Sequence, residues 1–145
     1  MSLRKMVLVV LLLVLSGCGI SSSKDDAAEV MTRYFAAIEA RDYPAAMAYY
    51  AETFFKETSR DTWEAQLQRY NRRLGNLESF EAVNWNVKKN VGANAGTYVQ
   101  VIYKTRYARH PAVEKFILKK AAAGFRIIVH RVEARGVPRG KTESI

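Results

Sequence analysis

The sequence has few of the residues that build disulfides, metal sites and nucleophilic centres. Its 145 residues include one cysteine and two histidines. A disulfide needs two cysteines, and a zinc site takes three or four ligands, so neither is expected. No Gly-x-Ser-x-Gly elbow, glycine-rich phosphate loop or Cys/His pair is present. We therefore predict no metal, no cofactor and no catalytic residue.

The one cysteine, Cys18, follows the longest apolar run in the chain. Two basic residues near the start precede this run at 6–15, and Ser16-Gly17 separates it from the cysteine. A basic, then apolar, then small-residue order is typical of a secretory signal peptide. The run is shorter than the roughly 20 residues that a membrane-spanning helix needs. We predict a signal peptide at residues 1–17.

The segment "LSGC", which ends at Cys18, resembles the lipobox of bacterial lipoproteins. The resemblance implies cleavage between Gly17 and Cys18, and a diacylglyceryl group, with palmitate-like chains, on the cysteine sulfur. Two acyl chains hold a protein stably on a membrane, because each buried methylene contributes about 0.8 kcal/mol. Gly19 stands where inner-membrane lipoproteins carry Asp, which implies the outer membrane, facing the periplasm. Residues 18–23 are then a lipidated tether.

Acidic residues are scarce in the second half of the chain. The whole chain has 23 Lys and Arg against 14 Asp and Glu. Residues 24–81 hold 8 basic and 11 acidic residues, whereas residues 82–145 hold 13 basic and 3 acidic ones. This asymmetry indicates either contact with an anionic surface or a solvated sheet face. Nucleic acid is not an expected partner, because the predicted location lies outside the cytoplasm.

The first half of the mature chain has the apolar spacing of helices. A serine pair at 22–23 is the expected cap of the first helix. Asp42 can cap the second helix, and Ser59 or Asp61 the third. Gly75 is placed to end the third helix in a left-handed conformation. The predicted helices span residues 24–40, 42–54 and 59–75.

From residue 77 onward the apolar period changes to two, which indicates strands. Glu81, Val83, Trp85 and Val87 are expected on one face of the first strand. His110, before a proline, is expected in a turn. Helices followed by meandering strands predict an α+β fold, with three N-terminal helices packed on a curved four-stranded antiparallel sheet. The predicted units are strands at 77–90, 97–109, 113–120 and 125–134, one domain at 24–134, and a polar, mobile tail at 135–145.

The segments "RDYPAAMAYY", "RRLGNLES", "GTYVQVIYKTRY", "AVEKFIL" and "GFRIIVHRVEA", with Trp63 on the third helix, occur in the order of a known family. They resemble the nuclear-transport-factor-two-like, or SnoaL-like, cone fold, which is cystatin-like. Within it the chain is similar to small bacterial domains of unknown function that often carry secretion signals. The resemblance covers about residues 27–134. Some cone-fold relatives are isomerases or hydrolases and others bind ligands or dimerise, so the fold does not settle function.

Aromatic residues are the candidate ligand-binding groups. Tyrosines at the mouth of a cone suit a small apolar ligand, while packing in the core is the alternative for each ring. His130 lies mid-strand, where it is either a hydrogen-bonded sheet residue or an acid–base group. The candidate ligand-binding residues are Tyr34, Trp63, Tyr70, Tyr103 and His130.

Three functional hypotheses follow. The first is a non-enzymatic, lipid-anchored cell-envelope module that binds a small apolar ligand or an envelope protein, with a homodimer through the sheet. The second is a small cone-fold enzyme, isomerase- or hydrolase-like, that uses Glu114 or His130 as acid or base; a cross-strand ion pair is the competing interpretation of Glu114. The third is a surface-adhering structural protein that uses its basic half. A cavity filled by tyrosine rings would favour the first over the second.

Overall fold

A computed structural model describes residues 18–134, so the predicted signal peptide and C-terminal tail lie outside the described residues. Within 18–134, no helix is long and apolar enough to cross a membrane. Helices come first in the chain, and four strands follow. The elements are α2 (Cys18–Glu39), α3 (Tyr43–Met47), η2 (Phe54–Lys56), α4 (Arg60–Leu74), β1 (Leu77–Asn90), η3 (Gly92–Asn94), β2 (Gly96–Tyr107), β3 (Pro111–Ala121) and β4 (Gly124–Ala134).

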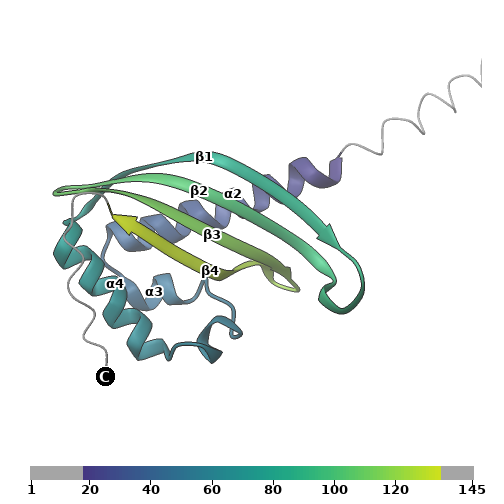
Figure 1. Cartoon of the computed structure of the whole chain (residues 1–145), viewed down its shortest axis with the longest axis horizontal. Coiled ribbons are helices and arrows are strands. Elements are labelled where there is room, and N and C mark those ends of the chain that lie inside the picture. The colour runs from purple at the N-terminus through teal and green to yellow at the C-terminus, as the bar shows by residue number, and fades with distance from the viewer. Residues whose placement is uncertain (1–17, 135–145) are drawn as a thin grey trace, which may run out of the picture.

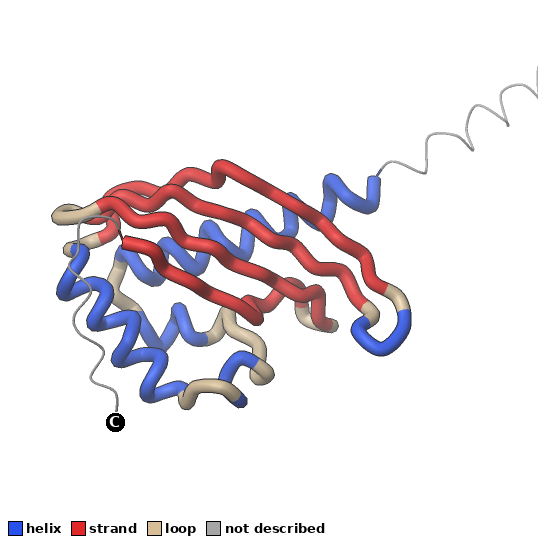
Figure 2. Tube along the Cα trace, viewed as in Figure 1, coloured by secondary structure: helices blue, strands red, loops and turns tan. Residues whose placement is uncertain are grey.

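The strands form one antiparallel sheet in the order β1-β2-β3-β4, as the meander predicted. Figure 1 shows the sheet as a curved layer, with α2 running along it and α3 and α4 lying beside its β4 side. Figure 2 shows the same two layers by element type, helices against strands. This is the predicted α+β architecture.

The core lies between the helices and the inner face of the sheet. On β2 and β3 the buried positions alternate with exposed or half-buried ones, so one face of each strand packs on the helices. On α2 the buried positions recur every three or four residues, which gives one apolar stripe. The fully buried side chains of this core include Met31, Tyr34, Phe35, Val99, Val101, Phe116, Leu118, Phe125 and Ile127.

Three helix ends behave as the sequence predicted. The Asp42 side chain accepts a hydrogen bond from the Ala45 amide, and the Ser59 side chain accepts one from the Thr62 amide. Gly75 ends α4 with a φ of 90°. A Cβ there would lie 2.9 Å from the Ala108 Cβ, so the close approach of the β2–β3 turn also requires glycine.

Three sequence predictions about element boundaries were wrong. The first helix already includes Cys18, where the described residues begin, instead of starting near residue 24, so the 22–23 serine pair lies inside the helix and the 18–23 segment is helical. The second helix ends at Met47 instead of continuing to residue 54. The helix ends there because the next segment pairs with β4. The Ala51 amide donates to the Ile127 carbonyl, and the Ile127 amide donates to the Tyr49 carbonyl.

The third wrong prediction concerns the first strand. A register shift between Ala82 and Asn84 breaks the alternation of the strand, so that the odd-numbered residues just before it face outward and those just after it face inward. Glu81 therefore pairs with the outward Lys104, whereas Trp85 pairs with the buried Val101. The four residues expected on one face are split between the two faces.

Among residues 18–134, no helix covers the outer face of the sheet (Figures 1 and 2), and the strand register gives this face many cationic side chains. Glu81 and Glu133 point outward from regular pairs, and Glu78, in the register shift before Ser79, forms an ion pair with the outward Arg106 at 3.5 Å; these carboxylates lie at the end of the sheet near the β2–β3 turn. Half-buried apolar residues such as Ile102 and Ile117 lie between the charges. The outward cations are Lys88, Lys104, Arg106, Lys115, Lys119, Arg126 and Arg131.

Candidate functional site

A buried carboxylate on β3 is the centre of a polar cluster inside the cone. Glu114 is 1% exposed, and its Oε1 atom accepts hydrogen bonds from the Tyr107 hydroxyl at 2.6 Å and the Thr105 hydroxyl at 3.0 Å. Its Oε2 atom lies 2.8 Å from Nε2 of His130. Strand alternation puts these residues together, since each occupies an inward position on one of three adjacent strands.

The cluster continues from the sheet into the helical layer. The other ring nitrogen of His130, Nδ1, lies 2.8 Å from the Tyr50 hydroxyl, which lies 3.0 Å from the Tyr34 hydroxyl. Tyr34 comes from the buried stripe of α2. Tyr50 is held over β4 by its bridge to Ile127. We call this set the Glu114 network; its members are Tyr34, Tyr50, Thr105, Tyr107, Glu114 and His130.

Hydrogen-bond counting assigns the tautomer of His130. If Nε2 carries the proton and donates to Glu114, then Nδ1 accepts from Tyr50, and the Tyr50 oxygen accepts from Tyr34. Every hydroxyl then has an acceptor. If Nδ1 carried a proton too, Tyr50 would have to donate to Tyr34, and the Tyr34 hydroxyl would have no acceptor among the described residues. We therefore assign a neutral imidazole with its proton on Nε2.

Aromatic rings enclose the imidazole of His130. Phe116 stacks on it with ring centres 4.1 Å apart, and Trp63 meets it edge-on at 5.5 Å. Tyr34 makes a second edge contact at 6.0 Å. Among the described residues, the Trp63 Nε1 atom is the buried side-chain donor or acceptor without a hydrogen-bond partner.

The tyrosines of the network stay protonated because they are buried. Burial raises the pKa of Tyr34 well above its usual value, and the adjacent Tyr50 and the charge of Glu114 raise it further. Burial likewise raises the pKa of Tyr50. For Tyr107, burial raises the pKa and the Glu114 charge adds to the effect. These hydroxyls are therefore neutral donors across the physiological pH range.

Little space remains around the network. The cavity beside it has a volume of about 10 Å³, which is near the minimum needed to hold one water molecule. An acid or base must come within about 3 Å of the atom it protonates, and no such atom of a substrate fits here. The cavity is lined by Tyr34, Ile38, Leu67, Tyr70, Asn71, Tyr107, Glu114 and His130.

The structure brings together most of the predicted ligand-binding residues. Tyr34, Tyr70 and His130 line the same small cavity, and Trp63 packs on His130. Tyr103 does not join them, because it packs at 4.9 Å from Phe35 in another part of the core. There burial raises its pKa to about 12.

Sequence reasoning missed three members of the network: Tyr50, Thr105 and Tyr107. Two of these had a readable signal, since Thr105 and Tyr107 lie two residues apart and strand alternation puts them on the same face. Tyr50 had none, because its position depends on the bridge to Ile127. For Glu114 the competing interpretation was a cross-strand ion pair; its partners are two hydroxyls and the imidazole of His130 on the neighbouring strand.

The network is not a metal site. Within residues 18–134, no three side chains of His, Cys, Asp or Glu gather closely enough to hold a metal ion. Glu114 and His130 contribute one carboxylate and one imidazole, which are already bonded to each other. Their partners on the other side are hydroxyls of tyrosine and threonine.

Comparison with solved structures shows the fold. A crystal structure described as a "putative dehydratase from the NTF2-like family" from Streptomyces avermitilis superposes with a TM-score of 0.55. The alignment covers 81% of this chain and 99% of that one, at 7% sequence identity. The chain therefore has an NTF2-like fold, and at this identity the likeness extends to the fold alone.

Sequence comparison shows the family. No curated protein matches the chain in sequence. The family model that matches covers residues 30–129, from the apolar stripe of α2 to the middle of β4, and includes every member of the Glu114 network except His130, which lies one residue beyond the match. The chain therefore belongs to the DUF4019 family, described as proteins of unknown function.

Proposed function

We propose that this protein is a lipid-anchored domain of the bacterial cell envelope that binds its partner on the outer surface and does not catalyse a reaction. The filled interior of the cone supports the second half of this proposal. The network's polar groups are bonded to one another, and the cavity of about 10 Å³ leaves no room for a substrate. Tyrosine rings fill the space, which is the arrangement that favours a binding module over an enzyme.

The anchoring half of the proposal is supported by the "LSGC" segment and the start of α2. The lipid-bearing residue would be Cys18, the first residue of a helix that is continuous with the packed core. With a rise of about 1.5 Å per residue, Lys24 lies only about 9 Å along the helix from the anchor. The domain would therefore be held close to the membrane, with its basic outer face in the periplasm.

Mass spectrometry of the protein purified from membranes tests the anchor. We expect an amino terminus at Cys18 with a diacylglyceryl group, and loss of membrane association in the Cys18→Ser variant. Ser16→Ala, next to the site but not at the modified sulfur, is the matched control and should keep the anchor. A protein that retains Met1 and fractionates with the cytosol would contradict the proposal.

An acid–base enzyme is the second candidate, and two observations favour it. Glu114 contacts Nε2 of His130 at 2.8 Å, an arrangement that can orient an imidazole base. The buried Trp63 N–H interacts only weakly with the Tyr50 side chain and has no acceptor at hydrogen-bond geometry, so it offers a donor to a ligand. Catalysis would require the tyrosines to move apart and admit a substrate.

Proton exchange tests this second candidate. Small ketones and 3-hydroxy acids in D₂O, followed by proton NMR, report abstraction of a proton next to a carbonyl. The binding proposal predicts no exchange above the rate without protein. Exchange that disappears in His130→Gln and persists in the turn variant His110→Gln would favour the enzyme.

A further inference from the structure

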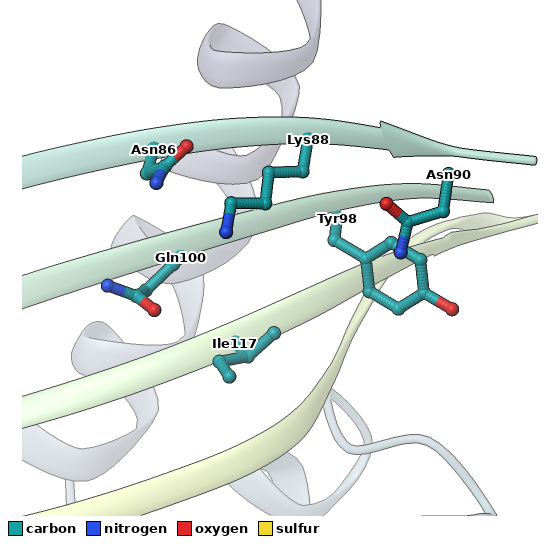
Figure 3. A pocket seen from close by; sticks show the side chains of 6 residues that line it. All are labelled: Asn86, Lys88, Asn90, Tyr98, Gln100 and Ile117. Atoms are coloured by element: carbon teal, nitrogen blue, oxygen red, sulfur yellow. The ribbon is translucent and has the colours of Figure 1, made fainter. Parts of the chain in front are cut away.

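A groove opens on the outer face of the sheet, away from the Glu114 network. It has a volume of about 190 Å³ and lies near the β1–β2 connection. Figure 3 shows its side chains projecting from β1, β2 and β3 on the same side of the sheet. The lining residues are Asn86, Lys88, Asn90, Tyr98, Gln100 and Ile117.

The strand register builds this groove. Asn86 pairs with Gln100, and Gln100 pairs with Ile117, which gives one row across three strands. Lys88 pairs with Tyr98 in the next row. The groove therefore combines a flat apolar floor with polar groups spaced along the ladder.

Three carboxamides surround the groove and are not committed to other residues. Asn86, Asn90 and Gln100 make no side-chain hydrogen bond with another residue in the 18–134 range. Each amide offers two N–H donors and one carbonyl acceptor. Sugar hydroxyls both donate and accept, so they suit groups of this kind.

The aromatic ring in the groove is held in place. The Tyr98 hydroxyl donates to the Asn94 carbonyl at 3.1 Å, and the Lys119 ammonium lies 5.3 Å from the ring centre. Figure 3 shows the ring between Asn90 and Ile117. A fixed ring beside hydrogen-bonding amides is a binding platform whose ordering cost has already been met.

The charge around the groove is positive. Lys88, Lys119 and Arg126 lie in the same cross-strand row as Tyr98. Among the residues that the structure describes, no carboxylate lines the groove. The outward Glu81 lies opposite Lys104, six residues along β2 from Tyr98, or about 20 Å away. At physiological salt the Debye length is about 8 Å, so this carboxylate does not offset the cations.

From this combination we infer that the groove binds an acidic oligosaccharide, with its sugar face on Tyr98, its hydroxyls on the carboxamides and its acidic group near Lys88. This inference rests on the proposed function, because it names the class of ligand that the outer surface of the binding module would take. An anionic membrane would need only the cations. The uncommitted amides and the fixed ring favour a sugar.

Isothermal titration of the mature chain, with Cys18→Ser for solubility, tests the site. The probes are tetragalacturonate and muramidase-released glycan fragments of peptidoglycan as acidic sugars, maltotetraose as a neutral sugar, and poly-aspartate as an anion without sugar. We expect at least one acidic sugar to bind at least about tenfold more tightly than either control probe, a ratio that corresponds to about 1.4 kcal/mol.

Variants locate the binding. Tyr98→Ala and Asn86→Ala should each weaken the binding of the acidic sugar. Tyr98→Ala should lower the affinity about tenfold or more, by analogy with stacking on aromatic platforms. Each variant is first checked for a melting temperature within a few degrees of wild type. Lys88→Gln should cost about fivefold, whereas Lys104→Gln, the same charge loss on the same face outside the groove, should leave affinity unchanged. Because Asn86 is exposed, its variant keeps the test decisive even if Tyr98→Ala fails to fold.

Three outcomes would overturn the inference: no binding of either acidic sugar, equal binding of poly-aspartate, or binding only to vesicles containing anionic phospholipid. The last would assign the basic face to the membrane. The proposal of a lipid anchor is tested separately, because an amino terminus without the diacylglyceryl mass would contradict it whatever the groove binds. If the native protein carries no lipid but binds the acidic sugar, the anchoring proposal is wrong and the inference about the groove stands.

Discussion

Replacing Glu114 by glutamine tests whether the Glu114 network is a structural core or a catalytic site. Glutamine has nearly the same shape, and its carbonyl can still accept from Tyr107 and Thr105. Its NH₂ group, however, then faces the N–H of His130, and two donors cannot bond to each other. The imidazole must move its proton to Nδ1 to relieve this conflict.

Moving this proton also changes the hydrogen bonds of Tyr50 and Tyr34, the next two members of the network. Nδ1 now donates to Tyr50, so the Tyr50 hydroxyl must donate to Tyr34, and the Tyr34 hydroxyl loses its acceptor. A buried donor without a partner costs about 1–3 kcal/mol, and two hydrogen bonds to a charged group become neutral, at about 0.5–1 kcal/mol each. We expect Glu114→Gln to lower the free energy of unfolding by about 3 kcal/mol.

Urea and thermal unfolding measure this change. For a domain of this size, about 3 kcal/mol corresponds to a fall in melting temperature of about 12 °C. Glu133→Gln, the same substitution at an exposed outward position of β4, is the matched control and should stay within about 0.5 kcal/mol of wild type. A Glu114→Gln variant as stable as wild type, or more stable, would refute the reasoning, because residues kept for catalysis commonly cost stability.

Three further predictions follow from the fold and the anchor. Burial raises the pKa values of Tyr34, Tyr50 and Tyr107 above their usual value near 10, so the folded chain keeps protons that the unfolded chain loses. Stability should be complete below pH about 10 and fall above it by about 1.4 kcal/mol per pH unit for each tyrosine. Burial also raises the pKa values of Tyr43 and Tyr103, so Tyr107→Phe should reduce this slope in alkaline denaturation by about a fifth; an unchanged slope would contradict the assignment. Gly75→Ala, at a φ of 90° and with its new Cβ 2.9 Å from Ala108, should lower the free energy of unfolding by about 1–3 kcal/mol; a neutral result in urea denaturation would show that the turn can yield. Cys18→Ser should move the protein from the membrane fraction to the soluble periplasmic fraction in immunoblots, and continued sedimentation with membranes would argue against the thioether.

Local chemistry made parts of the fold predictable from the sequence. The caps at Asp42 and Ser59 are local hydrogen bonds, and Gly75 is needed by its own backbone angle. The four strands and their order follow from alternation and short turns, because neighbouring strands in a meander pair. These features depend on residues that are close together in the chain.

Other parts depend on contacts between distant segments. The second helix stops at Met47 because residues 49–51 pair with β4, about eighty residues further along. The register shift between Ala82 and Asn84 is set by pairing with β2, and apolar alternation alone does not reveal it. Helix α2 extends back through residues 18–23, so the serine pair that local reasoning favoured as its cap lies inside the helix.

The candidate site was partly predictable for the same reason. Alternation places Glu114 and His130 on inward positions of neighbouring strands, so both were candidates from the sequence. The arginines of the neighbouring strands, such as Arg106 and Arg131, point outward and are not partners of the inward Glu114. Tyr50 joins through tertiary pairing alone. The sequence therefore shows which polar residues enter the core, but the structure is needed to show that they satisfy one another.

NMR mapping of the bound ligand tests the central claim most directly, namely that the cone is filled and the partner binds outside it. Titration of ¹⁵N-labelled mature chain with the tightest acidic oligosaccharide should shift the backbone amides of residues 86–90, 98–100 and 117. The amides of Tyr34, Tyr50 and His130 should stay in place. Shifts confined to those three positions, with an unchanged outer face, would place the ligand inside the cone and contradict the account.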